Sequence, residues 1–269
     1  MTAAPGLLPI RTSGPTDGRP VILLHGFLAD SRQWYTLTRA VDARTRHRIR
    51  WLLPDLPGHG QAADLFPAQP GWHDLTQLLA ESLRPHLYQP AVLGGYSMGG
   101  RIAAALAAAE WLDLAGLWLE SAHPPLSEAA ALARRTEDAE RAQRLETAGL
   151  PAFVSAWEAL ALFASQQALP PAVRDRQRRL RLGQNAAGLA RNLRGYGTGT
   201  MPRDLRLHLP TRLLVGAGDT NLLRRLPEWQ PLVADLETTV APDAGHAVHL
   251  EQPAFTAEHL DATLDRHFS

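Results

Sequence analysis

The chain has 269 residues, of which 45% are hydrophobic, so it is long enough to bury the core of one large domain. Its 27 positively and 27 negatively charged side chains cancel near neutral pH, which gives no electrostatic basis for binding nucleic acid or a membrane surface. It contains no cysteine, which excludes disulfides, a thiol nucleophile and thiolate metal sites.

The first half of the chain alternates between short apolar runs and helical patterns. Strands are expected near Leu7–Thr12 and at Val21–Leu24, Trp51–Leu53, Ala91–Gly95 and Leu114–Glu120, with helices after Asp30, over about 72–87 and from Met98 to Trp111. This order implies right-handed crossovers and a mostly parallel sheet. No apolar run reaches the ~18 residues of a membrane span, and the N-terminus lacks a charged-then-apolar signal pattern. We therefore expect a cytoplasmic protein.

The stretch Gly95-Tyr96-Ser97-Met98-Gly99 matches Gly-x-Ser-x-Gly, the nucleophile elbow. A strand pattern precedes it and an alanine-rich helical pattern follows it, which is the context the motif requires. So sharp a turn forces the serine into a strained backbone conformation, and a Cβ on either glycine would collide with the neighbouring strand or helix. The hydroxyl is thereby placed at a helix N-terminus, where backbone N–H groups favour negative charge.

The alternation stops between residues 124 and 207. Four helical patterns follow one another there, at Glu128–Ala148, Pro151–Leu162, Pro170–Leu182 and Ala187–Tyr196. It resumes with strands at Thr211–Val215 and Leu236–Val240 and with helices around Leu222–Asp235 and from Pro253. We therefore predict an α/β core formed by residues 1–123 and 208–269, with a helical cap inserted at 124–207. The arginine-rich run at 174–181 is expected to be the solvated face of one cap helix.

Three chemically complementary groups follow predicted strands. Ser97 ends one strand, Asp219 follows the strand at Thr211–Val215, and His246 lies in the loop after the last strand. In open α/β sheets the ligand site lies beyond the carboxyl ends of the strands, and the order Ser, Asp, His is that of the α/β-hydrolases. Serine is a poor nucleophile or base by itself, and an imidazole oriented by a carboxylate activates it.

Each member of this set has a competitor. Asp219 could simply cap the following helix, and Glu120 is a rival acid at the end of an earlier strand. His246 competes with three other histidines, His25, His59 and His249. We favour His246 because it alone closes a glycine loop after the last strand.

Two backbone amides complete the predicted site, and the sequence contains no cofactor motif. The N–H groups of Phe27 and Met98 are expected to form an oxyanion hole. The sequence shows no metal-ligand cluster and no phosphate-type glycine loop, so we expect chemistry without a cofactor.

The sequence resembles the α/β-hydrolases over nearly its whole length. It resembles in particular the MenH family, the 2-succinyl-6-hydroxy-2,4-cyclohexadiene-1-carboxylate synthases of menaquinone biosynthesis. The stretches that carry this resemblance are Gly95–Arg101, Leu119–Pro124, Trp157, Leu162–Gln166, Arg181–Asn185 and Leu193–Gly199. Most of them lie in the predicted cap, which is normally the variable part of this superfamily. The chain departs from the family pattern at Pro125 and Glu158.

The resemblance implies roles for particular residues. It implies a triad of Ser97, Asp219 and His246, oxyanion amides at Phe27 and Met98, carboxylate-binding guanidinium groups at Arg101 and Arg134, and a pocket lined by Tyr96, Trp157, Phe163 and His25. Planar, bidentate guanidinium groups suit a carboxylated substrate, and Arg101 lies one helical turn after the serine. Arg134 is adjacent to Arg135, and the sequence leaves open which of the two faces the site.

A MenH-like enzyme is a lyase that removes a proton from a small carboxylated substrate and expels pyruvate. A serine esterase or carbon–carbon bond hydrolase on the same triad is the alternative, because one constellation serves both acyl transfer and proton abstraction. A catalytically silent ligand-binding protein is a third hypothesis. Epoxide and haloalkane hydrolysis need an Asp at the elbow, and Ser97 argues against both.

Overall fold

The computed structural model describes residues 6–68 and 71–268, and its centre is a seven-stranded sheet. The strand order is β1-β3-β2-β4-β5-β6-β7, and every pairing is parallel except that of β1 with β3. The strands are β1 (Ile10–Ser13), β2 (Arg19–Leu24), β3 (Ile49–Pro54), β4 (Ala91–Tyr96), β5 (Leu114–Glu120), β6 (Thr211–Gly216) and β7 (Leu236–Ala241). The predicted α/β-hydrolase architecture is confirmed.

The central strands are apolar over most of their length because both faces of the sheet are covered. In β2, Val21 and Leu23 pack into one hydrophobic cluster, whereas Ile22 and Leu24 pack into the other. Successive side chains of a strand point to opposite faces, so a strand that is buried on both faces needs a continuous apolar run.

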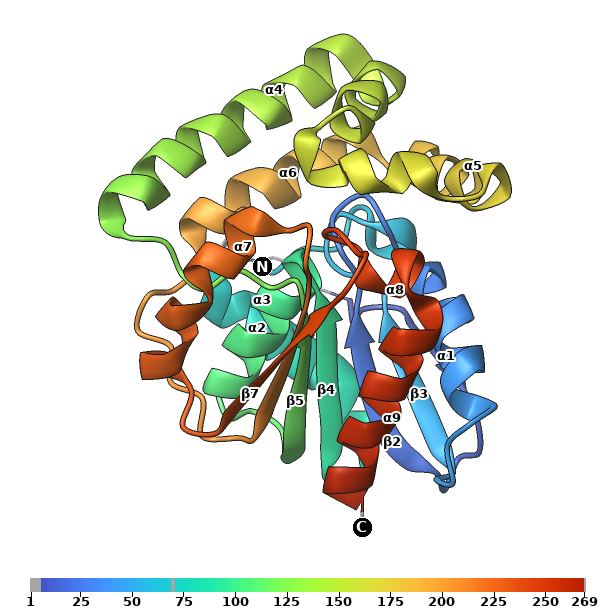
Figure 1. The fold of residues 1–269 in the computed structure, drawn as a ribbon. Coiled ribbons are helices and arrows are strands. Elements are labelled where there is room, and N and C mark those ends of the chain that lie inside the picture. The colour runs from blue at the N-terminus through green and yellow to red at the C-terminus, as the bar shows by residue number, and fades with distance from the viewer. Residues whose placement is uncertain (1–5, 69–70, 269) are drawn as a thin grey trace.

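Helices cover both faces of this sheet (Figure 1). α1 (Tyr35–Asp42) and α9 (Pro253–Phe268) pack on one face, and α2 (Trp72–Leu83) and α3 (Met98–Ala108) pack on the other. The short helices are η1 (Ser31–Trp34), η2 (Gly60–Ala62), η3 (Arg84–His86), α7 (Thr220–Arg225), η6 (Leu226–Leu232) and α8 (Val248–Glu251). The single helix predicted around Leu222–Asp235 was wrong: the chain forms α7 and η6 instead, because Pro227 and Pro231 remove backbone donors.

A helical insertion follows β5 and lies over the carboxyl ends of the strands (Figure 1). It comprises α4 (Glu128–Glu158), η4 (Ala161–Ala168), α5 (Pro171–Leu182), α6 (Ala186–Tyr196) and η5 (Thr198–Thr200). Gly149, with φ of 79°, breaks α4 between the two helices that the sequence predicts. Phe153 and Leu189 help to build a separate hydrophobic cluster that Leu28 of the core joins. The helical insertion thereby covers the edge of the sheet where the candidate residues lie.

Candidate active site

The turn between β4 and α3 has the strained geometry that the elbow motif predicts. Ser97 has φ of 52° and ψ of −108°, and its backbone N–H donates to the Glu120 carbonyl at 2.8 Å. A Cβ on Gly95 would collide with the backbone of Gly99, and a Cβ on Gly99 with the backbone of Leu24. The two glycines therefore let helix and strand approach closely enough to hold the hydroxyl above the sheet.

The structure brings Ser97, His246 and Asp219 together from three different strand ends. His246 Nε2 lies 2.9 Å from the Ser97 Oγ, and His246 Nδ1 lies 2.6 Å from Asp219 Oδ2. A carboxylate beside Nδ1 keeps the proton on that nitrogen, so Nε2 is free to accept the serine proton. The imidazole is thus placed to activate the hydroxyl.

Asp219 also fills the competing role that the sequence left open. Its second oxygen, Oδ1, accepts a hydrogen bond of 3.1 Å from the Leu222 N–H and caps α7. Burial is the largest single effect and opposes ionisation of this carboxyl, but the hydrogen bond and charge of His246, together with the hydrogen bond from the Leu222 N–H, outweigh it and lower the pKa of Asp219. The cap and the contact with the imidazole therefore coexist on one carboxylate.

The rival acid Glu120 pairs with a different histidine. Its Oε1 lies 2.8 Å from His249 Nδ1 and also accepts from the His249 backbone N–H at 3.0 Å. The Tyr96 ring contacts both histidines, with centroids 5.4 Å from His246 and 4.8 Å from His249. Glu120 and His249 thus form a second buried acid–histidine pair. Tyr96 lies against both histidines, and His246 makes no hydrogen bond to Glu120.

The loop after β2 presents a free amide near the elbow. The Phe27 N–H donates no hydrogen bond to any residue that the structure describes, and Met98 is the first residue of α3, where no intrahelical acceptor exists. A Cβ on Gly26 would lie 2.6 Å from the Tyr96 ring, so this loop packs tightly on the residue before Ser97. The two amides remain the candidate oxyanion donors.

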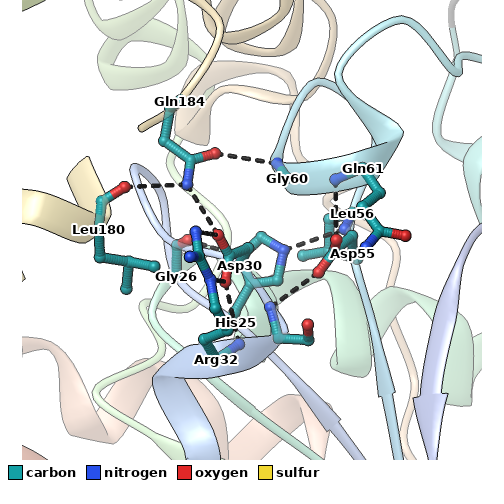
Figure 2. A network of polar contacts seen from close by, with 11 residues as sticks. His25, Gly26, Asp30, Arg32, Asp55, Leu56, Gly60, Gln61, Leu180 and Gln184 are labelled. Atoms are coloured by element: carbon teal, nitrogen blue, oxygen red, sulfur yellow. Dashed lines mark hydrogen bonds and ion pairs between the residues drawn. The ribbon is translucent and has the colours of Figure 1, made fainter. Parts of the chain in front are cut away.

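The structure differs from the prediction at His25, which supports this loop and does not line the cavity. His25 is fully buried, and its Nε2 accepts from the Leu56 N–H at 3.0 Å. Its Nδ1 therefore carries the proton and donates to the Gly26 carbonyl at 2.9 Å. Both ring nitrogens are used by the backbone, so the side chain has no free group for a substrate (Figure 2).

A polar network joins this loop to the helical insertion. Gln184 donates to Asp30 Oδ2 at 3.0 Å and accepts from the Gly60 N–H at 2.9 Å, as Figure 2 shows. Asp55 accepts from the Gln61 N–H at 2.9 Å in the same network. One side chain in the turn between α5 and α6 thereby fixes two loops of the core.

A cavity of about 720 Å³, including solvent at its mouth, lies between the elbow and the helical insertion. Its walls include both sides of the candidate site and much of the predicted pocket: Phe27, Tyr96, Ser97, Met98, Arg101, His123, Arg134, Asp138, Trp157, Phe163 and His246. Trp157 connects Phe27 to Phe163, with centroid distances of 5.2 and 5.7 Å. Phe27 and two of the residues predicted for the pocket, Trp157 and Phe163, therefore form one continuous aromatic wall.

Arg101 is a buried guanidinium group on the cavity wall. Only 7% of the residue is exposed, and no carboxylate of the described ranges lies within ion-pair distance of it. Burial, with a contribution from Arg134, lowers the pKa of Arg101 to about 10, so it stays charged at neutral pH. A buried charge without a counterion is costly, and an anionic ligand would offset that cost.

The structure separates Arg134 from Arg135. Arg134 lines the cavity, whereas Arg135 Nη1 donates to the Gly199 carbonyl at 3.2 Å. Arg134 Nε donates to Asp138 Oδ1 at 2.8 Å, and Arg141 Nη1 reaches the same oxygen at 3.2 Å. The buried carboxylate therefore anchors Arg134 through Nε and leaves its terminal nitrogens free of protein acceptors within the described residues.

Sequence reasoning missed several residues at this cavity. Asp138 lies on a predicted polar helix, and only its i, i+4 spacing from Arg134 could have drawn attention to it. His123 follows the end of β5, and that strand-end position was its signal. Arg181, predicted to lie on a solvated face, does not line this cavity; it pairs with Glu158 at 2.9 Å and lies over the Phe163 ring.

The structure offers no arranged metal site within the residues it describes. No group of three or more His, Cys, Asp or Glu side chains there is placed to hold a metal ion.

Within residues 6–68 and 71–268, no single helix is long and apolar enough to cross a membrane. α4 and η4 taken together meet the same length and composition test, but they are bent by 74° relative to each other.

The fold agrees with comparisons to known proteins. A family model described as the alpha/beta hydrolase family matches residues 21–259. A protein of Escherichia coli O81 (strain ED1a), named 2-succinyl-6-hydroxy-2,4-cyclohexadiene-1-carboxylate synthase, is 35% identical over 246 residues, which are 87% of this chain and 89% of that protein.

Two solved structures also match over nearly the whole chain. The structure of MenH from S. aureus superposes with a TM-score of 0.89 at 30% identity, covering 97% of this chain and 99% of that one. A thermophilic esterase from Thermogutta terrifontis, with malate bound, superposes with a TM-score of 0.80 at 27% identity, covering 97% and 94%.

Proposed function

The chain belongs to the alpha/beta hydrolase family, and from that premise we propose that it is a lyase of menaquinone biosynthesis. The proposed substrate is 2-succinyl-5-enolpyruvyl-6-hydroxy-3-cyclohexene-1-carboxylate, and the products are pyruvate and the cyclohexadiene for which the E. coli relative is named. The observation that carries this proposal is the buried Arg101, which lies in the same cavity as the Ser97–His246 pair and has no carboxylate at ion-pair distance among the described residues. A simple esterase needs only the Ser97–His246 pair, whereas an enzyme for a substrate with several carboxylates also needs a cation such as Arg101 to bind them.

In the proposed reaction Ser97 acts as a base and forms no acyl bond. Its hydroxyl proton passes to His246 Nε2 as the serine oxygen takes the proton from the ring carbon that carries the succinyl ketone. The C–H electron pair moves into the ring, the double bond shifts, and the bond to the enolpyruvyl oxygen breaks. The departing group takes a proton, which restores the imidazole, and leaves as pyruvate.

The predicted oxyanion hole stabilises the intermediate charge in this reaction. Proton loss next to the succinyl ketone places negative charge on the ketone oxygen, and the N–H groups of Phe27 and Met98 would hold it. One well-placed donor of this kind stabilises a transition state by about 3 kcal/mol. Asp219 stabilises the imidazolium that forms on His246.

Pyruvate release from the enolpyruvyl substrate by the purified protein tests this proposal. Wild-type protein should release one pyruvate per substrate, and Ser97→Ala should lose at least about 10³-fold in kcat. Ser155→Ala, at an exposed position on α4, is the matched control and should retain full activity. A Ser97→Ala variant that releases pyruvate at the wild-type rate would overturn the assignment of the base.

Hydrolysis by the same triad is the second candidate function. The likeness to the T. terrifontis esterase and the distance of 2.9 Å between Ser97 Oγ and His246 Nε2 favour it, because acyl transfer uses the same pair. A p-nitrophenyl ester assay set against pyruvate release separates the two. Ester turnover without pyruvate release would favour a hydrolase over the lyase.

A further inference from the structure

His123 lies on the wall of the cavity, and the proposed reaction gives it no role. It follows the carboxyl end of β5, where the sheet presents its ligand-binding edge. Its ring centroid lies 6.4 Å from that of His246, with 33° between the ring planes. The side chain therefore lies within reach of any molecule that contacts the Ser97–His246 pair.

Arg225 determines which nitrogen of His123 carries the proton. Arg225 Nη1 lies 3.5 Å from His123 Nδ1, and because a guanidinium group only donates, Nδ1 has to accept. Arg225 is itself held by Glu228 at 3.0 Å and by the Pro125 carbonyl at 3.0 Å. The neutral ring consequently carries its hydrogen on Nε2.

The surroundings keep this imidazole neutral. Burial, with contributions from His246, Arg225 and Arg101, lowers the pKa of His123 to about 4, although Asp219 opposes the shift. At neutral pH the ring is an uncharged donor of one hydrogen bond. Its Nε2 makes no hydrogen bond to the residues that the structure describes, so that donor is available to a ligand.

We propose that His123 donates its Nε2 hydrogen to a carboxylate oxygen of the substrate, and that it acts with Arg101 to select carboxylated molecules. The positive charges of Arg101 and Arg225 both act on the ring and favour an anionic acceptor over a neutral one. A neutral N–H donor orients the carboxylate through a directional hydrogen bond, and it does not require a further charge to be buried. The identity of the full substrate rests on the proposed function. The claim that His123 Nε2–H donates to a carboxylate does not depend on it.

Two substitutions of His123 separate a ligand donor from a structural side chain. In His123→Gln the amide nitrogen lies close to the position of Nε2 and keeps a donor, whereas His123→Asn keeps an acceptor for Arg225 but loses the donor to the cavity. We expect His123→Gln to retain kcat/KM within about threefold. His123→Asn should lose about 10- to 100-fold in kcat/KM, mainly through KM, because losing a hydrogen bond to a charged group weakens binding by about this factor. Equal losses in the two variants, or no loss in either, would overturn the proposal.

Nuclear magnetic resonance tests the same claim without turnover. In 15N-histidine-labelled wild-type protein, the His123 ring should show a protonated Nε2 and an unprotonated Nδ1 between pH 6 and 8. Succinate should move the Nε2–H resonance downfield, and dimethyl succinate, which has no carboxylate, should not. A proton on Nδ1, or a resonance that succinate leaves unmoved, overturns the proposal. A wild-type protein that shows both signatures but releases no pyruvate would overturn only the proposed function.

Discussion

The strand-end loops and the helical insertion contribute different chemistry to the same cavity. Ser97 and His246 are 149 positions apart in the sequence and meet because β4 and β7 end at the same edge of the sheet. Arg134 and Asp138 are four positions apart and meet because they share a face of α4. Long-range topology thus assembles the acid–base groups, whereas local helix geometry arranges part of the cationic wall.

The two regions also differ in the kind of side chain they carry. The chain has 11 histidines, and none of them lies in the helical insertion between Glu128 and Thr200, which is rich in arginine. Buried imidazoles suit proton transfer near neutral pH, and guanidinium groups suit recognition of carboxylates. We infer that the core sets the reaction, and that the helical insertion, together with Arg101 and His123 of the core, sets the substrate.

The largest effect should come from the core. Asp219→Asn removes the carboxylate that holds the proposed tautomer of His246, and kcat should fall about 10³- to 10⁴-fold with little change in KM. Asparagine still caps a helix, so α7 and the melting temperature should change little. A fall of less than tenfold in pyruvate release would show that Asp219 does not orient His246.

A smaller effect, of a different kind, should come from the cationic wall. Arg101→Ala should lower kcat/KM about 10- to 100-fold, mainly through KM, because a hydrogen-bonded charge partner for a carboxylate is lost. Arg135→Ala is the matched control, since that guanidinium contacts the Gly199 carbonyl and not the cavity. If the two variants have the same KM, the proposed carboxylate site is elsewhere.

The junction between the two regions offers a third comparison. Gln184→Ala leaves the Asp30 carboxylate and the Gly60 N–H without this partner, and the free energy of unfolding should fall by about 1–3 kcal/mol. Because the network supports the loop that carries Phe27, a loss of kcat of a few-fold should accompany it. Gln167→Ala, at an exposed position, should change neither chemical denaturation nor turnover.

The buried histidines of the core predict a dependence of stability on pH. Burial, together with the neighbouring His25, lowers the pKa of His59 to about 3, whereas the unfolded chain binds this proton near pH 6.5. The unfolded state therefore holds more protons between these values, and the stability present above pH 6.5 is lost as the pH falls. One such group contributes a slope of up to about 1.4 kcal/mol per pH unit.

Urea denaturation of His59→Asn between pH 4 and 7 measures this contribution. Asparagine can keep a donor for the Pro57 carbonyl, which lies 3.1 Å from His59 Nδ1, but it does not titrate. The slope of the unfolding free energy against pH should therefore become shallower. The same substitution at the exposed His208 should leave the slope as it is, and an unchanged slope in His59→Asn would contradict the prediction.

The sequence by itself determined the elements and their order. The run Leu114–Glu120 is apolar up to its last residue and forms β5 with the predicted bounds, and the elbow at Ser97 has the predicted strain. Such features are encoded locally, because strand period, helix period and glycine requirements depend on near neighbours in the chain. The fold class and the three groups at the strand ends followed from them.

Only the tertiary structure decided which side chains face the cavity. Adjacent residues of a helix point about 100° apart, so packing, and not composition, turned Arg134 toward the cavity and Arg135 away from it. In the same way, the Leu56 N–H from a distant loop and the adjacent Gly26 carbonyl used the two nitrogens of His25, and one nitrogen of His123 stayed free within the described chain. These choices depend on partners brought together by the whole fold, and no local pattern in the sequence records them.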